Sequence, residues 1–450
     1  MKFKKNIAFT FVLIIIMMAS GLIISNSTTA SEEAVTSTGL NWEDAIPITN
    51  SNSNNSPLGA FRPSLALSND GEYIIVAYMK RTGASDGQAD PFVQYSTDRG
   101  EHWTSIPTPI RVSNDLSKFV AITIDQNNKG HAVWTEKNKE LWYGKENNSG
   151  TYDVKSIHSI AGGLQDVIQP PKIETFGNNI YTIWSQSENG PTDLYFKRSI
   201  DGGANFQSAV KLSNIDGLSM LADMIVDGSG HIHVVYRQQE ALTNPARTED
   251  RIYYTVSENA GVSWSTPIHI SGSINVSPDP VLFNQPTIYI TGNTIHVAFE
   301  NRVNFADQNV FYVSCTNACK TVENNWSGSK VSIQDYSAKD GDPAYLKPQM
   351  VTNGACPFIV FTGIIGNPTT ADERIRMGSK CEGWSKNPTI SSVDNVMGTN
   401  IRGINPSADT TNGWYIHFAF ERKEGALSND PGHIYVTRNI PAVYLPTILK

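Results

Sequence analysis

Seven positions, each just before the first strand of a repeated unit, form a polar group and an apolar group. Aligned by their surroundings, they are Arg62, Phe119, Pro170, Leu221, Gln285, Lys347 and Asn405. The positions in the fifth, sixth, seventh and first units are polar, and the other three are apolar. If the units surround one axis, its end is polar along one arc and apolar along the other. Such a surface suits an amphipathic ligand such as a sugar.

Further polar side chains follow the strongest β-forming segments on the polar arc. They are Lys80, Arg81, Glu300, Asn301, Arg302, Glu421, Arg422 and Lys423. Together with the seven aligned positions, these loops form a predicted site that we call the axial mouth. Its candidate binding residues are Gln285, Lys347, Asn405 and Arg81. The alternative interpretation is that the loop residues are ordinary solvated charges.

The elements that would position these residues repeat along the chain. Each unit has a short strand, a turn rich in Gly, Asn and Asp, a strongly β-forming strand ending in an aromatic residue, and a hairpin leading to an aromatic-led outer strand. The second strands are found at 73–78, 131–134, 180–184, 231–236, 294–299, 357–361 and 414–420. This pattern predicts an all-β, seven-bladed β-propeller of four-stranded antiparallel blades, with six blades as the alternative.

The seventh unit lacks an outer strand after its third strand, 432–438. Residues 41–49 (NWEDAIPIT) match the outer strand 263–271 (SWSTPIHIS) in their Trp, their Pro and their ending. We therefore predict that the N-terminal segment supplies the missing outer strand of the last blade. Closure of this kind also removes exposed sheet edges.

Three hairpin turns share the pattern Ser-x-Asp/Asn-x-Gly-x-x-aromatic, at 96–103 (STDRGEHW), 199–206 (SIDGGANF) and 257–264 (SENAGVSW). The Ser and Asp or Asn side chains can bond to amides of the turn, and the Gly can adopt a positive φ. The pattern resembles the Asp-box, or BNR, repeat of the sialidase superfamily. In that family the box is a turn device of β-propellers, so the resemblance implies an architecture for residues 41–440.

The resemblance also implies candidate catalytic residues. Phe61-Arg62-Pro63 looks like a shortened Arg-Ile-Pro signature, whose arginine joins two others to hold the carboxylate of sialic acid. It implies this role for Arg62, with Arg302 and Arg422 as partners. The family also uses a tyrosine activated by a glutamate, and an aspartate as acid and base. The residues available on the expected loops are Glu300, Glu421, Tyr345 and Asp86.

Two classes of function follow from this resemblance. The first is a sialidase-like propeller that binds anionic glycans at the axial mouth and, as an exo-sialidase-like glycoside hydrolase, cleaves them. The second is a non-catalytic propeller that binds glycans or protein at the cell surface. A scaffold without a small-molecule site is a third possibility.

The first 30 residues are typical of a secretory signal, since three lysines precede an apolar run at 7–24 and small residues follow at 28–30. We predict a secreted or cell-surface protein with a leader at 31–40 and a tail at 441–450. An uncleaved anchor is the alternative. Loss of the three lysines changes the net charge from -8 to -11, and an acidic chain is a poor nucleic-acid binder. We expect a monomer that binds carbohydrate, with no membrane insertion after signal removal.

Four cysteines in an exported chain predict two disulfides rather than a metal site. Cys315 and Cys319 flank a turn, and Cys356 and Cys381 fall within one unit, so local pairing is predicted. Histidines occupy equivalent second-strand positions in four units, at 131, 233, 296 and 417. Because equivalent positions of separate blades lie far apart, these histidines predict repeat packing rather than a shared metal. We expect no cofactor.

Overall fold

The computed structural model describes residues 41–440 apart from 44, 50–58, 83–87, 162–167, 169, 188–189, 214–217, 244–245, 273–282, 304–306, 332–346, 353–355, 366–371, 382–400, 412–414 and 425–431. These residues belong to a unit that spans Leu40–Lys450. The expected signal peptide, leader and tail lie outside the described residues and stay predictions.

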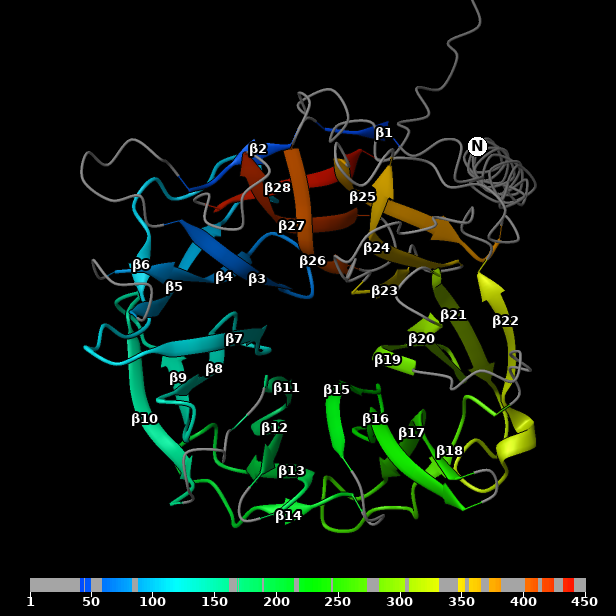
Figure 1. Ribbon diagram of the computed structural model, residues 1–450. Coiled ribbons are helices and arrows are strands. Elements are labelled where there is room, and N and C mark those ends of the chain that lie inside the picture. Colours follow the sequence, from blue (N-terminus) through cyan, green and yellow to red (C-terminus); the bar gives the residue numbers. More distant parts are fainter. Residues whose placement is uncertain are drawn as a thin grey trace, which may run out of the picture. The chain divides into compact units, whose positions relative to one another are not determined.

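The chain folds into seven antiparallel blades around one axis, as predicted (Figure 1). Blade 1 contains β3 (Ala60–Leu67), β4 (Ile74–Arg81), β5 (Ala89–Ser96) and β6 (Thr108–Pro109). Blade 2 contains β7 (Ser117–Ile124), β8 (Gly130–Glu136), β9 (Glu140–Glu146) and β10 (Tyr152–Ser159). Blade 3 contains β11 (Lys172–Phe176), β12 (Asn179–Ser187), β13 (Thr192–Ser199) and β14 (Val210–Lys211).

The remaining blades follow in chain order. Blade 4 contains β15 (Ser219–Val226), β16 (Ile232–Thr243), β17 (Ala246–Ser257) and β18 (Ile268–His269). Blade 5 contains β19 (Phe283–Thr291), β20 (Thr294–Val303), β21 (Asp307–Cys315) and β22 (Ser327–Val331), with the 3-10 turn η2 (Glu323–Asn325) before β22. Blade 6 contains β23 (Gln349–Thr352), β24 (Pro357–Ile365) and β25 (Asp372–Ser379). Blade 7 contains β26 (Ile401–Thr411), β27 (Tyr415–Glu424) and β28 (Gly432–Ile440).

The first strands of neighbouring blades touch all around the axis, including β26 of blade 7 with β3 of blade 1. The second strands lie behind them and are buried on both faces. In β4, for example, Ile74, Val76 and Tyr78 pack towards blade 7, and the alternate residues Ile75 and Ala77 pack towards blade 2. A strand sandwiched in this way needs a continuous apolar run, which is why these segments had the strongest β-forming sequences.

The N-terminal segment closes the ring, as the sequence predicted. β1 (Asn41–Trp42) and β2 (Ile46–Pro47) both pair with β28, where Trp42 lies opposite Asn439 and Pro47 opposite Tyr435. The guanidinium of Arg438 donates two 2.8 Å hydrogen bonds to the carboxylate of Glu43. The last blade therefore combines strands from both ends of the propeller.

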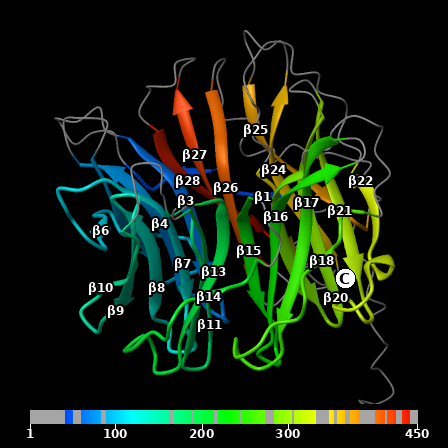
Figure 2. The same ribbon diagram turned by 60° about the horizontal axis from the view of Figure 1, so that its bottom comes forward.

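The three Ser-x-Asp/Asn-x-Gly turns fold alike. They follow β5, β13 and β17, of which Figure 2 labels β13 and β17. In the turn at 199–206, the Ser199 hydroxyl donates to Asp201 at 2.6 Å and accepts from the amide of Gly203 at 2.9 Å. The equivalent glycine amides donate to Ser96 and Ser257 at 2.8 Å. The three glycines have φ between 82° and 88°, so the predicted turn chemistry is confirmed.

The aromatic residue that follows each turn packs against the preceding blade. Phe206 lies edge-on to Tyr143, and Trp264 lies edge-on to Phe196, with ring centroids 5.0 Å apart in both pairs. Trp326 is buried against Tyr254 of blade 4. These aromatics join neighbouring blades.

Candidate functional site

The residues of the predicted axial mouth occupy equivalent places in the structure. In blades 1, 2, 4, 5 and 7 the pairing of the first two strands slips at this point, forming a β-bulge. Two residues of the inner strand then face one aromatic residue of the second strand, such as Tyr78 in blade 1. The alignment of the repeats made from the sequence is therefore correct for these blades.

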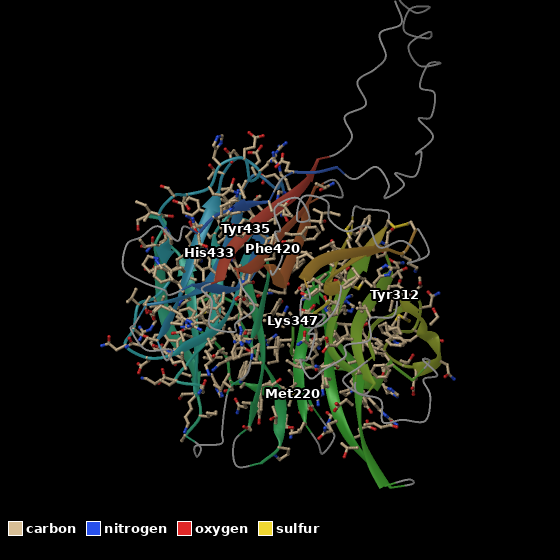
Figure 3. The ribbon with its side chains drawn as sticks, turned by 45° about the horizontal axis from the view of Figure 1, so that its top comes forward. Met220, Tyr312, Lys347, Phe420, His433 and Tyr435 are labelled. Atoms are coloured by element: carbon tan, nitrogen blue, oxygen red, sulfur yellow. A yellow bond between two sulfur atoms is a disulfide. The ribbon has the colours of Figure 1, made fainter. Side chains whose placement is uncertain are left out.

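In four of these bulges, and at Lys347 just before β23, a non-glycine residue has a φ in the left-handed region. The φ values are 54° at Arg62, 59° at Phe119, 54° at Leu221, 44° at Gln285 and 40° at Lys347. This conformation costs an L-residue roughly 1–2 kcal/mol, so the surrounding strand pairing must enforce it. Figure 3 shows Lys347 near the middle of the ring. The same backbone geometry thus presents different side chains around the axis.

Arg62 is the best-defined cation of the axial mouth. Its guanidinium carbon lies 4.4 Å from the centroid of the Phe119 ring in the next blade, a cation–π contact. The side chain is exposed, yet desolvation by the surrounding protein lowers its pKa, while the charge of Glu421 acts in the opposite direction. The guanidinium is therefore fixed in position and still accessible to a ligand.

Two glutamates lie at equivalent positions next to the mouth, in β20 and β27. Glu421 is 2% exposed, and its Oε2 accepts a 3.4 Å hydrogen bond from the amide of Arg62. Glu300 is fully buried, and its Oε1 accepts from Asn284 Nδ2 at 2.8 Å. Both carboxylates contact the inner strands, and the Glu421 contact joins blade 7 to blade 1.

Gly432 explains how blade 7 approaches blade 1 so closely. A Cβ atom at Gly432 would lie 2.6 Å from the carbonyl oxygen of Ala60 and 2.8 Å from Oε1 of Glu421. Both distances are too short for any side chain. Glycine at this position therefore lets Glu421 reach the start of β3.

The other predicted site residues are placed less tightly around Arg62. The guanidinium carbon of Arg81 lies 5.9 Å from the Phe61 ring centroid in the same blade. Arg302 lies opposite Gln308 at the end of β20, and Arg422 lies between Gly403 and His433 in blade 7. Asn405 lies in the bulge of β26. Tyr345 and Asp86 fall outside the described residues.

Charged residues on the inner strands were not identified from the sequence as site residues. Glu174 of β11, Asp223 of β15 and Asp409 of β26 come from three different blades. Burial raises the pKa of Glu174 to about 8, reinforced by the charges of Asp409 and Asp223. Burial also raises the pKa of Asp409 to about 6. The signal in the sequence was acidic residues within strands that otherwise pack around the axis.

Two of these carboxylates also join neighbouring blades. Asp223 accepts from the amide of Ile288 at 3.1 Å and forms a 3.0 Å ion pair with Lys172. Asp409 accepts from the amide of Leu67 at 3.0 Å. These acidic residues therefore fasten inner strands together.

Both predicted disulfides are present, Cys315–Cys319 in blade 5 and Cys356–Cys381 in blade 6.

Among the described residues, no helix is long and apolar enough to span a bilayer.

Comparisons with known proteins agree with the fold. The chain matches no protein-family model and no curated protein. A protein of unknown function from Dyadobacter fermentans is similar in structure, with a TM-score of 0.52 and 16% identity over 90% of this chain and 99% of that one. An ulvan lyase of a polysaccharide lyase family has a TM-score of 0.55 and 12% identity over 84% and 93% of the two chains.

A sialidase, NanB from Streptococcus pneumoniae, is more distant, with a TM-score of 0.44 and 10% identity over 88% of this chain and 70% of that one. The ulvan lyase, with a TM-score above 0.5, is by its name a polysaccharide lyase. At these identities the likeness establishes the fold and leaves the activity open.

Proposed function

We propose that this protein is an extracellular propeller that binds anionic glycans at the axial mouth through Arg62. One observation carries the proposal: an accessible guanidinium held over the Phe119 ring, on a backbone anchored by the buried carboxylate of Glu421. The two disulfides support an oxidising compartment outside the cell.

A fixed arginine is well suited to a planar anion. Its fork of N–H groups can form two parallel hydrogen bonds to a carboxylate, or bind a sulfate ester by the same donors. A free arginine side chain loses up to about 2 kcal/mol of conformational entropy when it is immobilised. Because stacking on Phe119 already restricts the Arg62 side chain, less conformational entropy is lost when the ligand binds.

The surroundings of Arg62 favour a sugar over a small inorganic anion. Gln285 and Lys347 share its backbone geometry and add an amide and a second cation to the polar arc, while Phe119 and Leu221 supply the apolar arc. A pyranose ring has polar hydroxyl edges and apolar C–H faces, which match these two arcs. The ulvan lyase, by its name a polysaccharide lyase, has a similar fold, and this likeness concerns the fold alone.

Hydrolysis of the bound glycan is a second candidate function, because Glu421 lies beside Arg62. A glycoside hydrolase commonly uses two carboxyl groups that reach the scissile bond. Glu421 and Glu300 are 2% and 0% exposed and are both hydrogen-bonded within the protein. We therefore place binding first and hydrolysis second.

The test compares the purified chain with Arg62→Ala on an array of sialylated, uronic-acid-containing, sulfated and neutral glycans. Affinities for the retained glycans are then measured by calorimetry. Loss of a charge-assisted hydrogen-bonded contact of roughly 1.5–3 kcal/mol predicts about 10- to 100-fold weaker binding. Because Ala and Arg tolerate a φ of 54° equally poorly, Arg62→Ala should keep the fold and its melting temperature.

Arg99→Ala is the matched control. Arg99 also has a positive φ of 62° and lies in the turn at the opposite end of blade 1. It should bind like the wild type. Equal glycan binding by Arg62→Ala and wild type, or retention of neutral glycans only, would contradict the proposal. Release of a fluorophore from an aryl sialoside by the wild type would establish hydrolysis as well.

A further inference from the structure

The turn between β15 and β16 of blade 4 brings together Asp227, His231 and His233. Asp227 Oδ1 accepts hydrogen bonds from the amides of Ser229 and His231, both at 2.8 Å, which fixes the carboxylate. Its other oxygen, Oδ2, lies 3.0 Å from Nδ1 of His231 and 3.5 Å from Nε2 of His233. Each of the three residues therefore offers one ligand atom, and these atoms all lie within 4.8 Å of one another.

Blade 2 contains the same turn without the second histidine. Asp125 fixes the turn through the amides of Asn127 and Lys129, and its Oδ2 lies 3.2 Å from Nε2 of His131. The residue in the place of His231 is Lys129, which donates to the carbonyl of Asn147 at 3.3 Å. The aspartate and the strand histidine thus belong to the repeated fold, and His231 is the addition specific to blade 4.

The geometry points to a site for a divalent transition metal, most simply Zn²⁺, at Asp227, His231 and His233, with water in the fourth position. Zinc bonds of 2.0–2.1 Å place neighbouring tetrahedral ligands about 3.3 Å apart. The two oxygen-to-nitrogen distances of 3.0 and 3.5 Å lie on either side of that value. Two nitrogen ligands and one carboxylate are a donor set that zinc accepts.

The surroundings support this assignment. Nδ1 of His233 lies 2.8 Å from the hydroxyl of Tyr254, which orients the ring and directs Nε2 towards the ligand cluster. The ring of His231 is 36% exposed, so an ion can reach the cluster from solvent.

Within the described part of the chain, one other group of three His and carboxylate residues could supply ligands to one ion, namely Asp98, Glu101 and His102. It has one histidine, which is 87% exposed, and its aspartate belongs to a turn that the fold repeats elsewhere. This group provides the control for the blade 4 site.

The test uses the purified chain without a histidine tag, stripped of metal by a chelator and titrated with ZnCl₂ and with CoCl₂. We expect one zinc per chain and an intense visible cobalt spectrum of tetrahedral type. His231→Lys, which copies the blade 2 turn, should fold normally and bind zinc at least ~100-fold more weakly because one of three protein ligands is lost. His102→Lys should leave zinc binding unchanged.

Three results would overturn the assignment. The first is an absence of zinc binding to the wild type at micromolar concentrations. The second is unchanged zinc affinity in His231→Lys, and the third is loss of zinc binding in His102→Lys. Because the melting temperature of each metal-free variant is compared with that of the metal-free wild type, weaker binding is separated from misfolding.

Discussion

Replacing Gly203 by alanine is predicted to destabilise the protein through crowding against the neighbouring blade as well as through strain in its own backbone. It has a φ of 88°, and a Cβ atom there would lie 2.6 Å from Cζ of Tyr143 in blade 2. Tyr143 is 2% exposed and its hydroxyl is held by His131 at 2.6 Å, so it cannot move aside freely. The equivalent Gly100 has a φ of 86°, but its nearest neighbour would be 3.6 Å away.

The two glycines therefore separate backbone strain from interblade crowding. Gly100→Ala adds only the strain of a left-handed alanine, roughly 1 kcal/mol after the loss of chain entropy in the unfolded state is counted. Gly203→Ala adds the same strain and an overpacking cost of about 1–3 kcal/mol. For a unit of roughly 400 residues, the unfolding entropy is about 0.8 kcal/mol/K, so Gly203→Ala should melt about 1–4 °C below Gly100→Ala.

Differential scanning calorimetry of the two variants and the wild type at one scan rate measures this difference. Gly261→Ala provides a second test of crowding between blades, because a Cβ atom at Gly261 would lie 2.5 Å from Cζ of Phe196. It should resemble Gly203→Ala. Equal melting temperatures for Gly100→Ala and Gly203→Ala would refute the idea that the turn glycines are selected by contact between blades.

Two further predictions concern stability. Since the pKa of Glu174 is raised to about 8 in the folded protein, its ionisation opposes folding increasingly as the pH rises from about 4.5 to 8. Glu174→Gln should therefore raise the free energy of unfolding, measured by urea titration, by at least ~1 kcal/mol at pH 8 and have little effect at pH 4.5. An equal effect at both pH values would contradict this. The second prediction concerns the disulfides. Cys356 and Cys381 are 25 residues apart, and loop entropy predicts that replacing both by serine lowers the free energy of unfolding by about 3.5 kcal/mol. Cys315 and Cys319 are 4 residues apart, and the same replacement there should lower it by about 2 kcal/mol. Urea titration of the two double variants checks this order, and the reverse order would contradict it.

Local patterns in the sequence were sufficient to predict most of the fold. The Ser-x-Asp/Asn-x-Gly turns, the apolar second strands and the match between residues 41–49 and 263–271 each depend on short segments with a definite geometry. The pairing of Trp42 with Asn439 confirms the closure that this match predicted. The outer strand expected for blade 6 lies outside the described residues.

The site was harder to predict because its geometry arises between blades. The aligned column matches the bulges of blades 1, 2, 4, 5 and 7, but the bulge and its positive φ values depend on the register of β3 against β4 and of the equivalent pairs. Proline after Arg62, Gln285 and Lys347 was the available signal, since it disfavours the helical region for the preceding residue.

Contacts across blade boundaries could not be derived from one sequence. The stacking of Arg62 on Phe119 joins residues of neighbouring blades, and the bond from the Arg62 amide to Glu421 spans 359 positions of the chain. The convergence of Glu174 and Asp409 likewise requires the closed ring. Sequence patterns identified the residue types, and ring closure decided which of them meet.

Glycan binding at the axial mouth is tested most directly by a crystal structure of the protein with an acidic oligosaccharide retained on the glycan array. We expect carboxylate or sulfate oxygens about 3 Å from the guanidinium nitrogens of Arg62, with the sugar lying across the axial mouth. An oligosaccharide bound at another surface, with no contact to Arg62, would contradict glycan binding at the axial mouth.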